Sequence, residues 1–409
     1  MRRPAWLTRN LLILTAVSFT QDAASELLYP LLPLFLTGVL AAPAVVVGVV
    51  EGVAEATAGI AKYVSGRWSD RIGRKPLTTV GYGLAVVGKA VVAAAWVWPV
   101  VLVGRVVDRL GKGIRSAPRD AWIADSVPAP SYGRAFGFHR AGDTLGAVVG
   151  PLLGLAALAA LSGNIRAAMW VAVVPAVLSV LLVLLARDPR ARRRGAPAPS
   201  PTGTAGDFDL SAARRPRPRR SPLPRPFWRV ATVLVLIAVV NFPDALLLLR
   251  VYELGFSTTE VVLAYVLFNV VYAAASYPAG AFSDRWPRSL IYGAGLLAFA
   301  VGYLGLGLVD GGPGVWVLIA VYGLFPALTD GVGKAWISSL VDEEHRGRAQ
   351  GVYQALTNAS IFAAGLWAGL AWTAGAGNGV VPLLISGVLG GLAGLALLTR
   401  PLWCRLRAL

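Results

Sequence analysis

The sequence predicts an all-α membrane protein with twelve transmembrane helices in two pseudo-symmetric six-helix bundles. Three observations support this fold class. Hydrophobic residues make up 56% of the 409 residues and charged residues only 14%, which is too apolar for an ordinary soluble protein of this length. Long apolar runs recur along the whole chain, each near the length of about 20 residues that spans a bilayer. Short polar sequences recur at matching places in the two parts of the chain, which indicates an internal repeat.

The predicted spans are apolar runs separated by short polar loops. They cover residues 10–36, 44–66, 77–97, 100–124, 133–158, 165–186, 228–250, 258–280, 289–309, 314–338, 347–372 and 379–400. The fourth and tenth spans are expected to be the weakest by hydropathy, because charged residues lie near their middles.

The segment 187–229 differs in composition from the rest of the chain. It is rich in Arg, Pro, Ala and Gly, and such a sequence cannot bury a hydrophobic core. We therefore predict a disordered basic cytoplasmic linker at 187–229. It would separate an N-terminal six-helix bundle, residues 1–186, from a C-terminal one, residues 230–409.

The positive charges indicate how the protein sits in the membrane. The net charge of +17 could suggest a nucleic-acid partner, but the cations fall in loops on one side of the predicted membrane, which orients a membrane protein. The inner-loop cations are Arg67, Arg71, Arg74, Lys75, Arg115, Arg119, Arg134, Arg285, Arg288, Arg346 and Arg348. This asymmetry predicts an inner (plasma) membrane protein with both termini cytoplasmic, and no nucleic-acid partner.

Other chemistry is not indicated by the sequence. The single cysteine, Cys404, excludes an intramolecular disulfide framework. The two histidines lie far apart, and no metal-ligand spacing occurs, so neither a metal nor a cofactor is expected. No nucleophile–base arrangement or phosphate-binding loop is visible, so an enzyme is not expected.

One predicted helix, residues 101–125, is unusually charged. Each ionised side chain at bilayer depth costs about 2.5–3.5 kcal/mol on insertion scales, so its charges must face a protein interior or a water-filled cavity. Arg105, Asp108 and Lys112 are spaced to share one helical face. The stretch 325–342 repeats the pattern, with Asp330 aligned on Asp108 and Lys334 on Lys112. Polar helices at matching places in both halves predict a transport pathway between them.

The strongest local signal is GRWSDRIGRKPL, residues 66–77. Gly66 allows close helix packing, and Asp70 stands among Arg71, Arg74 and Lys75 at a helix end. This pattern resembles the loop motif of the major facilitator superfamily, G-x-x-x-D-R-x-G-R-K/R. The resemblance covers nearly the whole chain outside the linker and implies two six-helix bundles around a central cavity that operate by alternating access.

The resemblance also implies a conformational latch, which we define as Gly66, Asp70, Arg71, Arg74 and Asp125. In the family, the acid and arginine of this loop hold one conformation, and Asp125 matches an acidic residue that joins them. A second copy, GAFSDRWPRSL at 280–290, lacks the following glycine and carries Pro287, so its latch is expected to be weaker.

Two further resemblances concern proton coupling and the direction of transport. Arg105 matches a fourth-helix arginine that proton-coupled members of the family use to bias a nearby acid. Asp108 could instead neutralise Arg105 permanently. The sequence LGAVVGPLLG, 145–154, resembles the exporter motif G-x-x-x-G-P-x-x-G. Its hinge and close-packing residues would be Gly146, Gly150, Pro151 and Gly154.

The remaining intramembrane polar residues are candidates for proton coupling or substrate binding. Asp22 and Glu26 are four residues apart, as are Glu51 and Glu55. Two carboxylates in a low-dielectric site rarely both stay ionised, which suits a proton carrier or a site for cations. The full candidate set is Asp22, Glu26, Glu51, Glu55, Arg105, Asp108, Lys112, Asp143, Asn241, Asp244, Asp330 and Lys334.

These observations favour a secondary active transporter that exports small amphipathic or cationic molecules in exchange for protons. Its partners would be a small-molecule substrate, protons and membrane lipid, and the family resemblance implies a monomer. Two alternatives stay open. Cations in the cavity could hold a small organic anion or nutrient during uptake, and the acids could hold a divalent metal ion during export.

Overall fold

The computed structural model describes residues 4–42, 44–187, 222–372 and 378–399, and all regular elements in this part of the chain are helices. The first half contains α1 (Arg9–Leu34), η1 (Phe35–Val39), α2 (Ala44–Ile72), α3 (Arg74–Ala94), α4 (Trp98–Asp125), η2 (Ala129–Ser131), α5 (Tyr132–Ala160), α6 (Ile165–Val171) and α7 (Val173–Leu184). The second half contains α9 (Arg225–Ala238), α10 (Asp244–Glu253), α11 (Thr258–Arg285), α12 (Arg288–Leu308), α13 (Gly314–Ser339), η4 (Glu343–His345), α14 (Arg346–Leu370) and α15 (Val380–Leu398).

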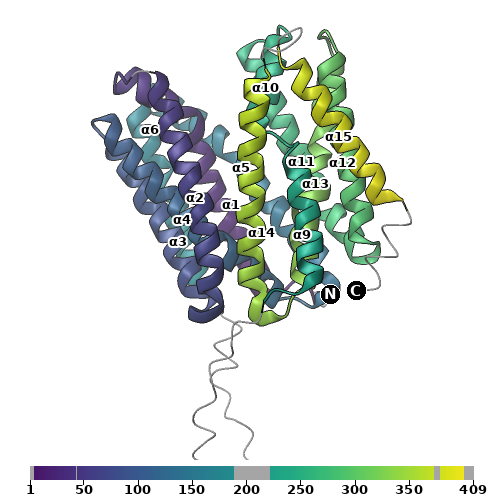
Figure 1. Cartoon of the computed structure of the whole chain (residues 1–409). Coiled ribbons are helices and arrows are strands. Elements are labelled where there is room, and N and C mark those ends of the chain that lie inside the picture. The colour runs from purple at the N-terminus through teal and green to yellow at the C-terminus, as the bar shows by residue number, and fades with distance from the viewer. Residues whose placement is uncertain (1–3, 43, 188–221, 373–377, 400–409) are drawn as a thin grey trace, which may run out of the picture.

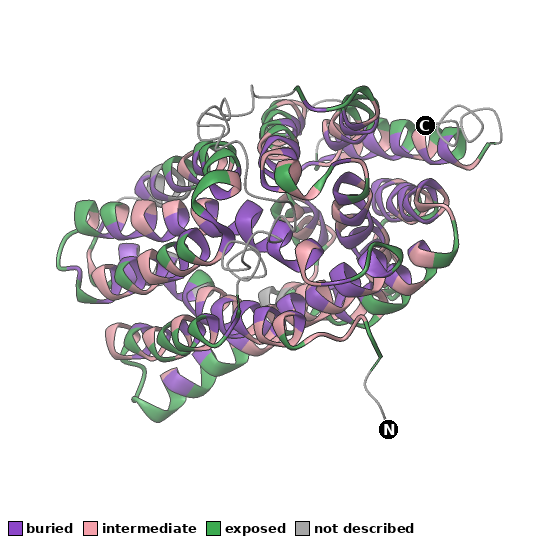
Figure 2. Cartoon of the chain, turned by 90° about the horizontal axis from the view of Figure 1, so that it is seen from below, coloured by how far each residue is buried: buried purple, intermediate pink, exposed green. Residues whose placement is uncertain are grey.

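The outer surface of the helices is apolar and the interior is partly polar. Phe362, Leu308 and Leu370 are each at least 70% exposed, whereas Arg105 and Asp120 are almost fully buried. Figure 2 shows buried residues on the helix faces that look toward other helices and exposed residues on the outer faces. This distribution is the reverse of that in a soluble protein and fits a surface solvated by lipid.

Eight helices of the described residues are long and apolar enough to span a membrane. They are Arg9–Tyr29, Arg74–Ala94, Ala129–Ala160, Ile165–Leu184, Leu263–Arg285, Arg288–Leu308, Gly314–Ser339 and Val380–Leu398. The span in α13 is among them, so the expectation that the tenth span would be weak by hydropathy is wrong. Its long apolar first part outweighs Asp330 and Lys334. The span in α4 is not among them, as expected from its charges.

Two boundaries differ from those expected. The predicted helix 228–250 is two helices, α9 and α10, because Pro243 disfavours a helical conformation at the residue before it. In addition, α9 begins at Arg225, so residues 225–229 are helical although the sequence placed them in the linker. Residues 188–221 of the predicted linker lie outside the described residues.

Helices of each half pack mainly on one another. In the first half α4 packs on α2 and α3, and α1 packs on α5 and α7. In the second half α12 packs on α13 and α15, and α11 packs on α13. Contacts between the halves are made chiefly by α5 with α11 and by α2 with α14. In Figure 1 the two groups lie close together near the N and C labels and diverge toward the end that carries α6 and α10.

Candidate functional site

The charged residues of α4 are buried because the helix is enclosed by neighbours. A side-chain carbon at Gly88 of α3 would lie 2.6 Å from the Gly104 carbonyl oxygen, so the two helices touch through their backbones. This close approach brings Lys89 within 2.6 Å of Asp108, whereas Arg105 lies 3.5 Å from the same carboxylate. Asp108 therefore has two cationic neighbours, and its pairing with Lys89 is the closer one.

A second group of charges joins the two halves. Arg140 of α5 donates to Asp143 at 2.8 Å and to Asp330 of α13 at 2.7 Å. The hydroxyl of Tyr272 in α11 donates to the same oxygen of Asp330. Asp330 is thus shared between the halves, and Arg140 connects it to an acid of the first half.

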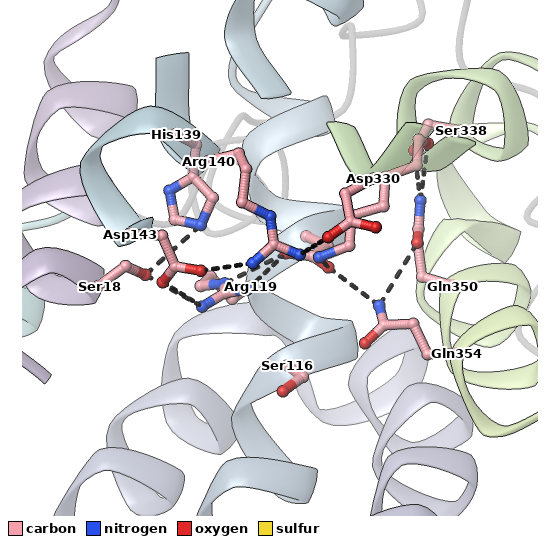
Figure 3. A network of polar contacts seen from close by, with 12 residues as sticks. Ser18, Ser116, Arg119, His139, Arg140, Asp143, Asp330, Ser338, Gln350 and Gln354 are labelled. Carbon is pink, nitrogen blue, oxygen red and sulfur yellow. Dashed lines mark hydrogen bonds and ion pairs between the residues drawn. The ribbon is translucent and has the colours of Figure 1, made fainter. Parts of the chain in front are cut away.

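Lys334 and Asp120 form the second cross-half ion pair, at 2.8 Å. Gln354 of α14 donates to the same oxygen of Asp120 at 2.9 Å, and Arg119 reaches its other oxygen at 3.1 Å. Arg119 also donates to Ser18 of α1 at 3.0 Å. Figure 3 shows side chains of α4, α5, α13 and α14 converging, among them Arg119, Arg140, Asp330 and Gln354. We call Arg119, Asp120, Arg140, Asp143, Asp330 and Lys334 the central charge network.

Several members of this network were not identified from the sequence. Arg115 and Arg119 were assigned to an inner loop, but both are buried within α4, so that assignment is wrong. Their position inside the predicted span 100–124, with Asp120 adjacent, was the sequence signal that they lie within the helix. His139, which lies 3.4 Å from Ser18, and the phenol of Tyr272 gave no comparable signal.

The acids of α1 lie beside the network without joining it by a direct contact. Asp22 and Glu26 make no ion pair or hydrogen bond among the described residues. Lys112 and Asp143 act on both carboxylates electrostatically. The candidate set named from the sequence contains Asp22, Glu26, Lys112 and Asp143, and the structure places these residues near one another.

The predicted acid pair of α2 is only partly described. Glu55 is half-exposed and lies 3.0 Å from Arg109 of α4. The side chain of Glu51 lies outside the described part of the structure. Glu55 and Arg109 therefore form an ion pair between two neighbouring helices of the first half.

Asp244 and Asn241 lie at the break between α9 and α10. Tyr322 of α13 donates to Asp244 at 2.6 Å, and Tyr303 of α12 donates to Asn241 at 3.5 Å. Asp244 is the first residue of α10, and Pro243 precedes it. The helix break thus places a carboxylate and an amide side by side among tyrosine hydroxyls.

The residues of the predicted latch meet at one end of the molecule. Arg74 lies 2.6 Å from Asp70 and 3.2 Å from Asp125. Asp70 also accepts hydrogen bonds from the backbone N–H groups of Gly347 and Arg348, at the start of α14. Such an acid at a helix N-terminus satisfies otherwise unpaired donors. The first half is thereby attached to the second at this end, which we call the latch end.

Other latch residues have different surroundings. Arg346 of α14 lies 2.7 Å from Asp125, so this acid is held by cations from both halves. A side-chain carbon at Gly66 would lie 2.7 Å from the Cα of Gly351, which shows that α2 and α14 cross in direct backbone contact. Arg71 is exposed on the surface.

The second copy of the loop motif makes a similar contact. Asp284 accepts hydrogen bonds from the backbone N–H groups of Gly133 and Arg134, at 2.6 and 3.0 Å, at the start of α5. The Arg134 side chain also donates to it at 2.9 Å. The two halves therefore hold each other through a symmetric pair of acid-to-helix contacts. The weaker strength expected for this copy stays a prediction.

The predicted glycine motif lies where α5 packs on α1. A side-chain carbon at Gly146 or Gly150 would lie about 3 Å or less from Asp22, Ala23 or Glu26. At Gly154 the nearest atom would be 3.3 Å away. Pro151 lies inside α5, which continues to Ala160. The absence of side chains at Gly146 and Gly150 therefore allows α5 to approach the two acids of α1.

Comparisons of the sequence with known proteins all point to the same family. The sequence profile of the Major Facilitator Superfamily matches residues 12–257 and 245–402. An uncharacterised MFS-type transporter of Methanocaldococcus jannaschii is 28% identical over 90% of this chain and 89% of its own length. The class C tetracycline resistance protein of Escherichia coli is 27% identical, with 90% and 94% covered.

Solved structures share the fold at lower identity. The human organic anion transporter MFSD10 superposes with a TM-score of 0.74 at 19% identity, and 97% of this chain and 100% of that chain are covered. The proton:xylose symporter XylE gives a TM-score of 0.74 at 18% identity, with 94% of each chain covered. With the profile match over both halves, these likenesses establish that the chain belongs to the Major Facilitator Superfamily of multi-pass membrane transporters.

Proposed function

We propose that this secondary transporter exports small amphipathic or cationic molecules in exchange for protons. Membership of the superfamily makes the protein a transporter of small molecules and not an enzyme. The finer proposal rests on the central charge network, in which two ion pairs join the halves. Asp22 and Glu26, which make no ion pair among the described residues, lie next to this network. Similarity to tetracycline resistance proteins supports export as the direction.

The architecture that we propose is twelve membrane spans in two six-helix bundles, with the basic linker between them. Four of the spans, α2, α4, α9 with α10, and α14, would carry polar groups that face the interior. Both termini and the latch end would be cytoplasmic, and the protein would be a monomer in the inner membrane. In this orientation, the latch would hold the cytoplasmic side closed, which corresponds to an outward-facing state.

Proton coupling would depend on how the halves move. In the closed arrangement at the latch end, Arg140 neutralises Asp143 and Asp330, and Lys334 neutralises Asp120. Separation of the halves would withdraw Asp330 and Lys334 together with α13. Arg140 could then act more strongly on the acids of its own half, and a change in their surroundings changes their affinity for protons. Arg105 would contribute through the same field, since it acts on Glu26.

The test is transport of the amphipathic cation ethidium in reconstituted vesicles that carry a pH gradient. We expect Asp22→Asn and Arg105→Ala to reduce gradient-driven transport at least tenfold, because the first removes a proton carrier and the second removes the charge that biases the carrier. Glu344→Gln, which removes an exposed acid outside the cavity, is the matched control and should transport normally. Normal gradient-driven transport in Asp22→Asn and Arg105→Ala, at unchanged protein levels, would exclude this mechanism.

Uptake of a small organic anion is the second candidate. It is favoured by Lys62 and Lys112, which act on each other electrostatically and make no ion pair within the described residues. Stabilisation of the purified protein against heat by organic anions, and not by ethidium, would favour this alternative. For metal export we find no supporting geometry, since no group of three or more His, Cys, Asp or Glu side chains suited to a metal occurs in the described residues.

A further inference from the structure

Asp244 differs from the other acids discussed above because no cation of the described residues acts on it, even at longer range. The charged group that acts on it among the described residues is Asp330, another carboxylate. Other interior acids are close to cations: Asp108 to Lys89, Asp120 to Lys334, Asp143 to Arg140, and Glu55 to Arg109. An intramembrane carboxylate requires a counter-charge or a proton. At Asp244 the described side chains supply no positive charge.

A row of stacked aromatic rings begins beside this carboxylate. Tyr322 donates to it at 2.6 Å, and the Tyr322 ring stacks on Phe268 with centroids 5.3 Å apart. Phe268 in turn stacks on Tyr265 at 6.2 Å. The faces of aromatic rings attract cations, and recognition of organic ammonium groups uses such rings together with an acid. The second half thus presents an aromatic wall next to a single negative charge.

The location is partly exposed and lies near α1 of the first half. Asp244 and Tyr265 are only partly buried, unlike Tyr322 and Phe268. Glu26 and Tyr29 of α1, as well as Asp244, act electrostatically on the Tyr265 phenol. Tyr265 therefore lies between an acid of the first half and Asp244, where a molecule bound between the halves would be in reach of both.

The charges of the facing half also favour a cation at Asp244. The first half carries Arg105, Arg109, Lys62 and Lys112 near Glu55. These cations have acids of the same half near them, Glu55, Asp108 and Glu26, whereas no cation of the described residues acts on Asp244. The two walls of the site thus differ in charge, which gives a bound molecule a preferred orientation.

We propose that Asp244, Tyr265, Tyr322 and Phe268 form a site in the second half that binds the positively charged aromatic part of an organic cation. Asp244 neutralises the charge, the exposed face of Tyr265 contacts the apolar groups, and Tyr322 positions the carboxylate. This inference rests on the proposed export of cationic molecules and specifies which half recognises them.

The test is binding of tetraphenylphosphonium, an aromatic monocation, to the purified full-length protein in nanodiscs, measured by calorimetry. We expect Asp244→Asn to weaken binding at least tenfold and Tyr265→Leu severalfold, whereas Tyr265→Phe keeps the ring and the affinity. Asp310→Asn removes an exposed acid between α12 and α13 and serves as the charge-matched control. Triphenylphosphine oxide, which is similar in shape but uncharged, should bind the wild type and Asp244→Asn equally weakly.

The outcomes separate the two proposals. If Asp244→Asn is unstable, as judged by its melting temperature, the comparison of Tyr265→Leu with Tyr265→Phe carries the test. If Asp244→Asn binds the cation as tightly as the wild type, this site assignment is wrong while cation export stands. If the wild type binds organic anions and not tetraphenylphosphonium, both the site and the proposed substrate class are overturned.

Discussion

How well a single buried charge is stabilised in this protein depends on how many partners it has. Asp125 has an unexposed side chain and lies between Arg74 of the first half and Arg346 of the second. Asp70 is partly exposed and combines one arginine with two backbone donors. Removing one partner of a buried pair leaves a charge without compensation, which costs more than the pair itself contributes. The latch residues should therefore respond strongly to single changes.

We expect Arg74→Ala to lower the thermal stability of the detergent-solubilised protein markedly. Breaking a buried ion pair costs about 3–5 kcal/mol. The loss should fall toward the lower end of this range, because Arg346 still pairs with Asp125. Because the loss comes from the uncompensated charge of Asp125, adding Asp125→Asn should cost less in the Arg74→Ala background than in the wild type. Strict additivity of the two substitutions in a double-mutant cycle would show that the two side chains are not coupled.

The sequence named three residues that the structure brings together at the latch end, and it named only part of the central charge network. Asp70 and Arg74 were identifiable because a local motif fixes their spacing, and Asp125 was added through the family resemblance. Arg119 was misassigned to a loop because burial depends on helices that pack around α4 and are distant in the sequence. The contact of Arg140 with Asp330 joins residues of different halves, and no spacing along the chain predicts such a contact.

Individual helices owe their positions to glycine residues at defined crossings. The packing of α5 on α1 is tight at Gly150, where a side-chain carbon would lie 2.6 Å from the carbonyl oxygen of Ala23. The glycine spacing in the sequence predicted close packing but not the partner helix. The break between α9 and α10 was detectable in the sequence Asn241–Phe242–Pro243, since helices usually end before a proline.

We expect Gly150→Ala to destabilise the protein by about 1–3 kcal/mol, the usual cost of overpacking a close contact. Gly154→Ala should cost less, because its nearest neighbour would be 3.3 Å away. Gly59→Ala in α2 has no atom within 4 Å and is the control. Melting temperatures in the order Gly59→Ala, Gly154→Ala, Gly150→Ala from highest to lowest are predicted, and equal values for all three would contradict the packing argument.

In the whole molecule, contacts between the halves concentrate at the latch end. The last turns of α2 and α11 each place an acid on the start of a helix in the other half, α14 and α5 respectively. The central charge network adds two ion pairs between the halves. A transporter that alternates access must break these contacts together, and substrate or protons can drive the change only by binding the two states with different affinity.

Distances between spin labels on the two halves test this account most directly. Labels at Ile72 and Arg285, both exposed at the latch end, and at Ser162 and Gly312 at the opposite end, can be placed in a protein with Cys404 replaced by serine. On a change of pH or on addition of tetraphenylphosphonium, we predict that the latch-end distance lengthens while the opposite distance shortens. Two distances that stay constant under all conditions, or that change in the same direction, would contradict alternating access by separation of the halves at the latch.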